Sequence, residues 1–284
     1  MLGNKLPFVL SDCDRTISHH DLSIDKDTIK SIKQYQKKSG YKFAFVTGRL
    51  DVANRKIAKQ LKVQMPIIAC NGAIITDLIT NDVLFADYLD KTATAAVFRE
   101  AATLEIDIIA YVPGAMVGVK GSERLTTWEN YLTTVKKKEK FDINYYPDLN
   151  AIADAIENEE VKPVELVVFS SSKTKQKVAR MIFDKYTDIF DTAQSLPQMF
   201  NAMNKGTNKL SGIKKWAEII GVDYRDIVTF GDNHNDIEMV SGVNKGYAVG
   251  NAVEELKAVA YEVCDNIENN GVGKVLEGMV RNNG

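Results

Sequence analysis

Two aspartates near the N-terminus are the residues of this chain best suited to do chemistry. Asp12 and Asp14 follow the apolar run Phe8–Leu10, which is typical of a buried strand. Side chains two apart on an extended segment point the same way, so both carboxyl groups can face one small volume beyond the strand. Because burying charge is costly, this arrangement predicts a cation or a reaction at that place. One aspartate could then act as nucleophile and the other as acid and base.

Polar side chains also follow two later apolar runs. The run 42–46 leads into Thr47-Gly48-Arg49, where a hydroxyl, an approachable backbone and a fixed cation could hold phosphate oxygens. The same tripeptide could instead be a plain turn into a helix. The run 66–69 leads into Asn71 and Gly72, which could contact a ligand or form an ordinary Asn-Gly turn.

A further acidic pair follows the apolar run 227–230. Asp232 and Asp236 lie four residues apart, so they share one face if a helix begins between them, near its positive end. A capped helix start would explain the pair as well. Lys205 precedes an amphipathic helix, and it could neutralise charge at the same place or remain an exposed surface lysine.

The chemistry predicted from these groups is phosphoryl transfer. Ligands of a doubly wound sheet bind beyond the carboxyl ends of its strands, so the groups are expected to meet there. Three acidic residues around an oxygen-rich site favour Mg²⁺, with waters and a substrate phosphate as its remaining ligands. In-line transfer to a carboxylate would give an aspartyl phosphate that water hydrolyses. Asp14 would protonate the leaving alkoxide and then take a proton from the attacking water.

The elements that must position these residues alternate between short strands and amphipathic helices in the first and last thirds of the chain. This alternation predicts an α/β fold with a doubly wound parallel sheet. Gly40 is placed to end the first helix. The expected strands are 8–10, 42–46, 66–69, 227–230 and 246–249, and the expected helices are 25–39, 51–61, 208–220, 236–240, 253–259 and one from about 271.

The middle of the chain has a different pattern, which predicts an α+β module inserted into the parallel core. We place the insert at 83–193, so the core comprises 1–82 and 194–284. Tyr111, Trp128 and Tyr131 of the insert could line a pocket or pack in its interior. The pattern gives hairpins of 73–78 with 83–89 and of 107–111 with 115–120, a strand at 164–170, and helices at 91–104, 123–135, 149–158 and 173–186.

The composition excludes several classes of protein. With 284 residues, 45% hydrophobic and 26% charged, the chain is long enough for two globular domains. A formal charge of -2 gives no reason to expect nucleic acid. Cys13, Cys70 and Cys264 are too widely spaced for a zinc site or a disulfide framework, which favours a reducing cytoplasm. No apolar run approaches the ~20 residues of a membrane span.

Taken together, these motifs resemble the haloacid dehalogenase (HAD) superfamily, and in particular its Cof-type phosphatases with an α/β cap of type IIB. The resemblance extends over nearly the whole chain and implies a Rossmann-like core with an inserted cap. It implies Asp12 as nucleophile and Mg²⁺ ligand, and Asp14 as acid and base. Asp14 would also bind the metal through its backbone carbonyl, and Asp232 would be the third protein ligand.

The resemblance also implies roles for residues around this centre. Thr47 and Gly48 would hold the phosphoryl group, and Lys205 would steady the nucleophile and the phosphate. Asp236 would support the metal ligands or Lys205. Three further positions complete the set: Asn235 would touch phosphate or a metal-bound water, and Arg49 and Asn71 match positions that commonly face the substrate.

One residue departs from the family pattern D-x-D-G-T, because Arg15 stands where glycine is expected. Glycine gives the backbone freedom close to metal and phosphate. Arg15 could strain the loop or add a cation to the pocket. We expect a tolerated substitution whose side chain points outward.

The expected function is that of a cytoplasmic Mg²⁺-dependent phosphatase for a small phosphorylated metabolite, with a sugar phosphate favoured by the resemblance. No nucleic acid or membrane partner is expected. A phosphomutase or phosphotransferase, a phospho-accepting signalling domain and a non-catalytic phosphometabolite binder are alternatives. Asp14 argues against the signalling domain, since an acid and base beside the nucleophile shortens the life of the aspartyl phosphate.

Overall fold

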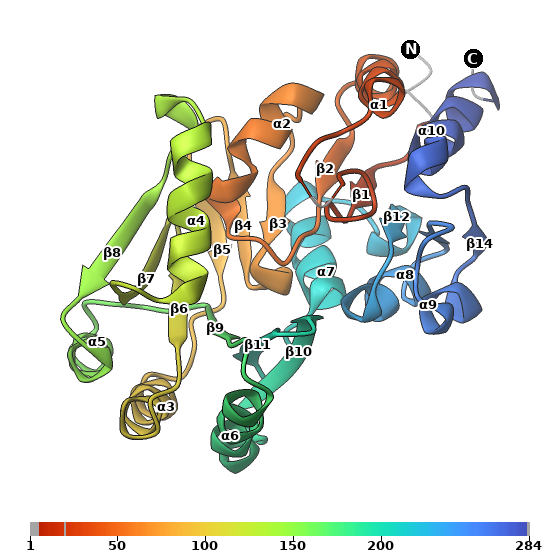
Figure 1. The fold of residues 1–284 in the computed structure, drawn as a ribbon. Helices are drawn as coiled ribbons and strands as arrows, with labels where there is room; N and C mark the ends of the chain where they lie inside the picture. The colour runs from red at the N-terminus through yellow and green to blue at the C-terminus, as the bar shows by residue number, and fades with distance from the viewer. Residues whose placement is uncertain (1–5, 20, 283–284) are drawn as a thin grey trace. The chain divides into compact units, whose positions relative to one another are not determined.

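The structure is a computed structural model that describes residues 6–19 and 21–282. The chain divides into two compact units, whose elements are labelled in Figure 1. The first unit comprises the described residues of Met1–Thr47, Arg55–Leu84 and Asn208–Gly284. The second comprises Gly48–Asn54 and Phe85–Thr207.

The first unit is built on a five-stranded sheet in the order β14-β13-β12-β1-β2, in which every neighbouring pair is parallel. All three residues of the interior strand β1 are buried, as expected for a parallel strand covered on both faces. This sheet confirms the predicted α/β core. Its strands are β1 (Val9–Ser11), β2 (Phe43–Phe45), β12 (Val228–Gly231), β13 (Lys245–Ala248) and β14 (Glu262–Val263).

The helices of the first unit precede, connect or follow these strands along the chain. The first of them ends where the sequence predicts, because Gly40 adopts a left-handed φ of 73° and its N–H donates to the carbonyl of Gln36. None of the helices in the described residues has the length and apolar character needed to cross a membrane. The helices are α1 (Lys26–Ser39), α2 (Arg55–Leu61), α7 (Lys209–Ile220), α8 (Ile237–Ser241), α9 (Glu254–Val259) and α10 (Gly271–Asn282).

The predicted strand at 66–69 does form, but it belongs to a separate three-stranded sheet. That sheet consists of β3 (Ile67–Ala69), β4 (Ile74–Asp77) and β5 (Asp82–Ala86), and β3 and β4 are antiparallel. An isolated parallel bridge between Val46 and Ile68 links β3 to the chain just after β2. The residues that follow β3 therefore still lie near the carboxyl end of β2.

The second unit combines a mainly antiparallel sheet with helices, in the order β10-β11-β9-β6-β7-β8, with β7 and β8 parallel. One apolar core joins residues of three of its helices, α3, α5 and α6, to this sheet. Its elements are α3 (Lys91–Thr103), β6 (Ile108–Val112), β7 (Ala115–Val119), α4 (Glu123–Thr134), β8 (Asp142–Tyr146), α5 (Leu149–Glu157), β9 (Glu165–Phe169), α6 (Lys173–Phe183), β10 (Phe190–Leu196) and β11 (Met199–Asn204).

The second unit extends beyond the predicted boundary at 193, and it also includes 48–54. Residues 194–207 belong to it because β10 and β11 form an antiparallel pair and β11 also pairs with β9. Four strands had no counterpart among the predicted ones, namely β8, β10, β11 and β14. The first two are edge strands with many exposed polar residues, so they lack the apolar run that identifies a buried strand.

Two glycines allow the start of α7 to lie directly against the turn after β3. A Cβ at Gly72 would lie 2.1 Å from the carbonyl oxygen of Asn208, and one at Gly212 would lie 2.7 Å from Cα of Gly72. Trp216 anchors the next turn of the helix, since its buried Nε1 donates to the carbonyl of Pro66 over 2.8 Å. These contacts fix where the first residue of α7 points.

We predict that Gly212→Ala destabilises the protein, whereas Gly278→Ala in α10 does not. The added methyl at 212 meets the backbone of Gly72 and costs about 1–3 kcal/mol through overpacking. A methyl at 278 meets no atom within 4 Å, and it should stabilise its helix by roughly 0.5–1 kcal/mol. Urea unfolding of the two variants measures the difference. Equal midpoints would contradict the close approach of α7 to the turn.

Candidate active site

The carboxyl ends of three parallel strands meet at one edge of the core sheet. The N–H of Asp12, just after β1, donates to the carbonyl of Phe230 in β12 over 2.9 Å. On the other side, the N–H of Val46, just after β2, donates to the carbonyl of Ser11 over 2.9 Å. The loops that follow β1, β2 and β12 therefore start side by side, where ligands of doubly wound sheets bind.

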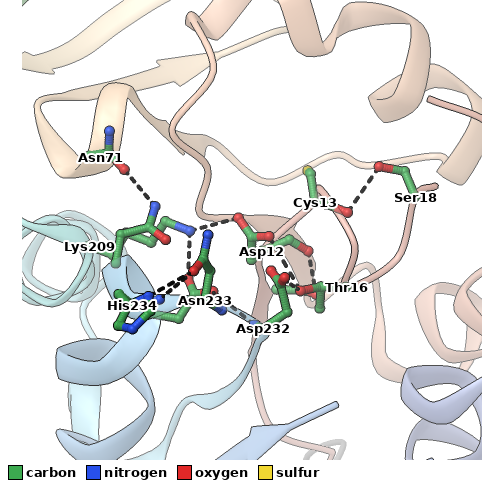
Figure 2. A network of polar contacts seen from close by, with 12 residues as sticks. Asp12, Cys13, Thr16, Ser18, Asn71, Lys209, Asp232, Asn233 and His234 are labelled. Atoms are coloured by element: carbon green, nitrogen blue, oxygen red, sulfur yellow. Dashed lines mark hydrogen bonds and ion pairs between the residues drawn. The ribbon is translucent and has the colours of Figure 1, made fainter. Parts of the chain in front are cut away.

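Three buried carboxylates converge at this edge. Asp12, Asp232 and Asp236 each offer one oxygen, and these oxygens lie within 4.8 Å of one another. The hydroxyl of Thr16 lies between two of them, 3.3 Å from Oδ2 of Asp12 and 3.4 Å from Oδ1 of Asp232 (Figure 2). The structure thus brings together two aspartates that are far apart in the sequence.

A fully buried lysine compensates part of this negative charge. Nζ of Lys209, the first residue of α7, lies 2.7 Å from Oδ1 of Asp12 and 2.5 Å from Oδ1 of Asp236. Burial alone would lower the pKa of Lys209, but the charges of the two carboxylates outweigh it and raise that pKa above its ordinary value. The ammonium therefore stays protonated, and both carboxylates depend on it for charge compensation.

Burial lowers the pKa of a lysine, but it raises the pKa of a carboxyl group, and it does so for two of these three. It raises the pKa of Asp12 to about 7, although Lys209 opposes the rise, and it raises the pKa of Asp232 to about 8. These raised pKa values mean that the nearby cations do not fully offset the cost of burying the two negative charges. A divalent cation placed among them would favour their ionised forms.

Asp236 anchors the turn that carries Asp232. Its Oδ2 accepts hydrogen bonds from the backbone N–H groups of Asp232 and Asn233, over 2.9 and 3.1 Å. Its Oδ1 contacts Lys209, so both oxygens of this carboxylate already have partners. A Cβ at Gly231 would lie only 2.5 Å from that of Asp236, so glycine is needed for the close packing. Asp236 thus links the turn that carries Asp232 to Lys209.

Asp232 has the properties of a metal ligand. Its side chain is 2% exposed, and its Oδ2 is buried without a hydrogen-bond partner among the described residues. A buried carboxylate oxygen of this kind needs a positively charged partner. The surrounding donors are oxygens, and oxygen is the ligand that Mg²⁺ prefers. The side chains of Asp12 and Asp232 therefore fit a divalent cation.

Arg15 does not point away from this centre, so the prediction of an outward side chain is wrong. Its Nη1 lies 3.6 Å from Oδ2 of Asp232, and its side chain is 41% exposed. Its φ of 62° is left-handed, a conformation that glycine adopts far more readily. The arginine thus keeps the backbone expected for glycine and adds a cation to the site.

A second set of polar residues lies beside the carboxylates and is joined by hydrogen bonds. The N–H of Asn71 donates to the carbonyl of Thr47 over 3.1 Å, and Nδ2 of Asn235 donates to Oδ1 of Asn71 over 3.0 Å. Asn71 and Cys70 both have positive φ, of 52° and 49°. Such backbone strain in residues other than glycine is characteristic of functional sites. Thr47, Asn71 and Asn235 therefore belong to one hydrogen-bonded group.

Asp14 also lies close to the centre, since its charge contributes to the raised pKa of Asp12. Gly48 and Arg49 belong to the second unit, where the side chain of Arg49 is buried. The charge of Arg49 opposes a rise in the pKa of Tyr131 that burial causes.

Lys209, and not Lys205, is the lysine that contacts Asp12. Lys205 belongs to the second unit, is exposed and pairs with Asp191 over 2.9 Å. The sequence did contain a signal for the correct lysine. Lys209 lies four and seven residues before Ile213 and Trp216, so helical periodicity places it on the buried face of α7.

Comparisons with known proteins give a consistent result. A sequence model of haloacid dehalogenase-like hydrolases matches residues 9–276. The pyridoxal phosphate phosphatase YbhA of Escherichia coli strain K12 is 25% identical over 253 residues, which cover 88% of this chain and 89% of that protein. The crystal structure of a haloacid dehalogenase-like hydrolase from Bacteroides thetaiotaomicron superposes with a TM-score of 0.81 at 17% identity. The match covers 97% of this chain and 100% of that one. The HAD subclass IIB sugar phosphatase BT4131 has a TM-score of 0.76 at 18% identity, with coverages of 96% and 99%. These two structures share the fold.

We predict that Lys209→Met strongly destabilises the protein and that Lys205→Met does not. Methionine at 209 leaves Asp12 and Asp236 buried without their cation, which costs about 3–5 kcal/mol. Methionine at the exposed position 205 should change the stability by no more than about 0.5 kcal/mol. Urea unfolding of both variants in the presence of chelator checks this. The assignment of Lys209 fails if the two substitutions have equal effects.

Proposed function

The chain belongs to the haloacid dehalogenase-like hydrolases, and we propose that it is a Mg²⁺-dependent phosphatase of the Cof type that uses Asp12 as nucleophile. The observation that carries the proposal is the convergence of Asp12 and Asp232 beside the buried ammonium of Lys209. A buried, partly compensated set of carboxylates suits a reaction that brings a dianionic phosphate to a nucleophilic carboxylate. The proposed substrate is the phosphate monoester of a small metabolite.

The residues proposed to hold Mg²⁺ are Asp12 and Asp232 through their carboxylates and Asp14 through its backbone carbonyl. When bound, the ion neutralises negative charge, so that a carboxylate and a phosphate can approach each other. The oxygen-only donor set and the unpartnered Oδ2 of Asp232 support this choice.

In the proposed first step, a carboxylate oxygen of Asp12 attacks the phosphorus and the bond to the ester oxygen breaks. Asp14 gives its proton to the departing alkoxide, which leaves as an alcohol. In the second step, Asp14 takes a proton from water while the water oxygen attacks the phosphorus of the aspartyl phosphate. The bond between phosphorus and the oxygen of Asp12 breaks, inorganic phosphate leaves, and both aspartates return to their starting forms.

Lys209 orients Asp12 and favours its ionised form, because it contacts Oδ1 of that carboxylate directly. It takes over the role that the sequence analysis gave to Lys205. We propose that Thr47 and Gly48 bind the phosphoryl oxygens, and that Asn235 contacts phosphate or a metal-bound water.

The proposed substrate follows from the family resemblance and from the comparisons with known phosphatases. Asn71 and Arg49 are proposed to face the substrate by the family resemblance, and Asn71 has the further support of its bond to Asn235. A sugar phosphate is our first choice, and the match to a pyridoxal phosphate phosphatase makes pyridoxal phosphate the second compound to test. A panel of phosphorylated metabolites, with inorganic phosphate measured as product, ranks these substrates and separates hydrolysis from transfer to a second sugar. A cytoplasmic location remains a prediction.

We predict that removal of divalent metal with a chelator abolishes hydrolysis of an aryl phosphate and that added Mg²⁺ restores it. Asp12→Asn should lower kcat by about 10³-fold or more, since the amide is a poor nucleophile. Asp14→Asn should lower it by about 10²–10⁴-fold, because proton transfer is lost. Release of p-nitrophenolate measures all three effects.

The matched control is Asp82→Asn, which neutralises an exposed aspartate in β5. It should retain the activity of the unmodified protein. Turnover that survives both the chelator and Asp12→Asn would exclude the proposed mechanism.

A further inference from the structure

We propose that the guanidinium of Arg15 is a tethered cation that competes with divalent metal for the carboxylate of Asp232 and weakens metal binding at this centre. The inference rests on the metal site of the proposed function and adds a regulation of that site. It concerns the one residue of the D-x-D-x-T segment that departs from the family pattern.

The backbone holds Arg15 in place at the edge of the centre. Its N–H donates to the carbonyl of Ser18 over 2.7 Å, and its own carbonyl accepts from Nδ2 of Asn251 over 2.8 Å. Asn251 is fixed in turn, because its Oδ1 accepts from the N–H of Ile267 over 3.0 Å. The left-handed conformation is therefore enforced from both sides, and the side chain starts beside the carboxylates.

The guanidinium lies against the oxygen that most needs a cation. Nη1 is 3.6 Å from Oδ2 of Asp232, which is too long for a hydrogen bond but close enough for strong electrostatic attraction. That oxygen is buried and has no hydrogen-bond partner in the described part of the chain. Within residues 6–19 and 21–282, the other oxygen of Asp232 has only the long contact to the hydroxyl of Thr16, at 3.4 Å. Arg15 thus offsets part of the negative charge of Asp232 but makes no hydrogen bond to its carboxylate.

The electrostatic consequence follows from the sign of the charges. The guanidinium of an arginine side chain carries a positive charge. A divalent cation that binds Asp232 meets this positive charge a few ångströms away and is repelled by it. Lys209 differs, because it is fully buried between Asp12 and Asp236 and cannot leave. Arg15 is 41% exposed, so its side chain can swing into solvent when metal binds.

The test is the affinity for Mg²⁺, measured by calorimetry on the full chain at one pH and low ionic strength. Arg15→Gln removes the charge and keeps a side chain, whereas Arg15→Gly also removes the backbone strain. Both should bind Mg²⁺ about tenfold more tightly than the unmodified protein. Arg15→Lys keeps the charge and should remain within about threefold of the unmodified protein. Arg225→Gln removes an exposed cation paired with Asp223 and controls for net charge.

Thermal unfolding gives a readout that is independent of activity. In chelator, Arg15→Gln should unfold at a lower temperature than the unmodified protein, because Asp232 loses its cation. Added Mg²⁺ should then raise its unfolding temperature by more than it raises that of the unmodified protein.

The outcomes separate this inference from the proposed function. Equal or weaker Mg²⁺ binding by Arg15→Gln, in a protein that binds the metal normally, would overturn the competition and leave the metal site intact. Tighter binding by Arg15→Gly alone would assign the effect to backbone strain and would also overturn it. If neither the unmodified protein nor Arg15→Gln binds Mg²⁺ or Mn²⁺ at millimolar concentration, the metal centre itself is wrong, and the inference fails with it.

Discussion

The burial of Lys209 between Asp12 and Asp236 is the interaction on which the rest of the site depends. Its ammonium ties together the end of β1, the turn after β12 and the start of α7. Charges this deeply buried are tolerated only when each has a close partner, so none of the three can move independently. The close contact of Gly72 with Gly212 and the packing of Gly231 against Asp236 both serve this arrangement. The fold therefore supplies a positioned nucleophile before any ligand is present.

The positive charges around the carboxylates differ in how permanently they are held. Lys209 is part of the interior, whereas Arg15 is half-exposed and reaches Asp232 only at 3.6 Å. The raised pKa values of Asp12 and Asp232 show that these two cations do not fully compensate the buried carboxylates. In the proposed mechanism a divalent cation would supply the missing positive charge, and unlike Lys209 and Arg15 it would exchange with solvent. The proposed activity would therefore follow the occupancy of one metal site.

The sequence predicts those features that depend on local patterns. Short apolar runs followed by Asp12 and Asp232 identified two loops that the structure brings together, and Gly40 marked the end of α1 correctly. Features that depend on distant partners were missed. The strands β8 and β10 form by pairing at sheet edges, and their polar residues give no local signal. Lys205 was named from its place just before an amphipathic helix, whereas the buried face of α7 holds a different lysine, Lys209. The direction of Arg15 depends on an oxygen of Asp232, which no local pattern reveals.

The central claim is that Asp12 and Asp232 bind one divalent cation. The most direct test is a crystal structure of the protein grown with Mn²⁺, with diffraction data that locate manganese by its anomalous scattering. We expect one strong anomalous peak about 2.0–2.3 Å from a carboxylate oxygen of each of these two aspartates. A manganese peak elsewhere, or a structure in which the carboxylates of Asp12 and Asp232 are too far apart to share an ion, would contradict the account.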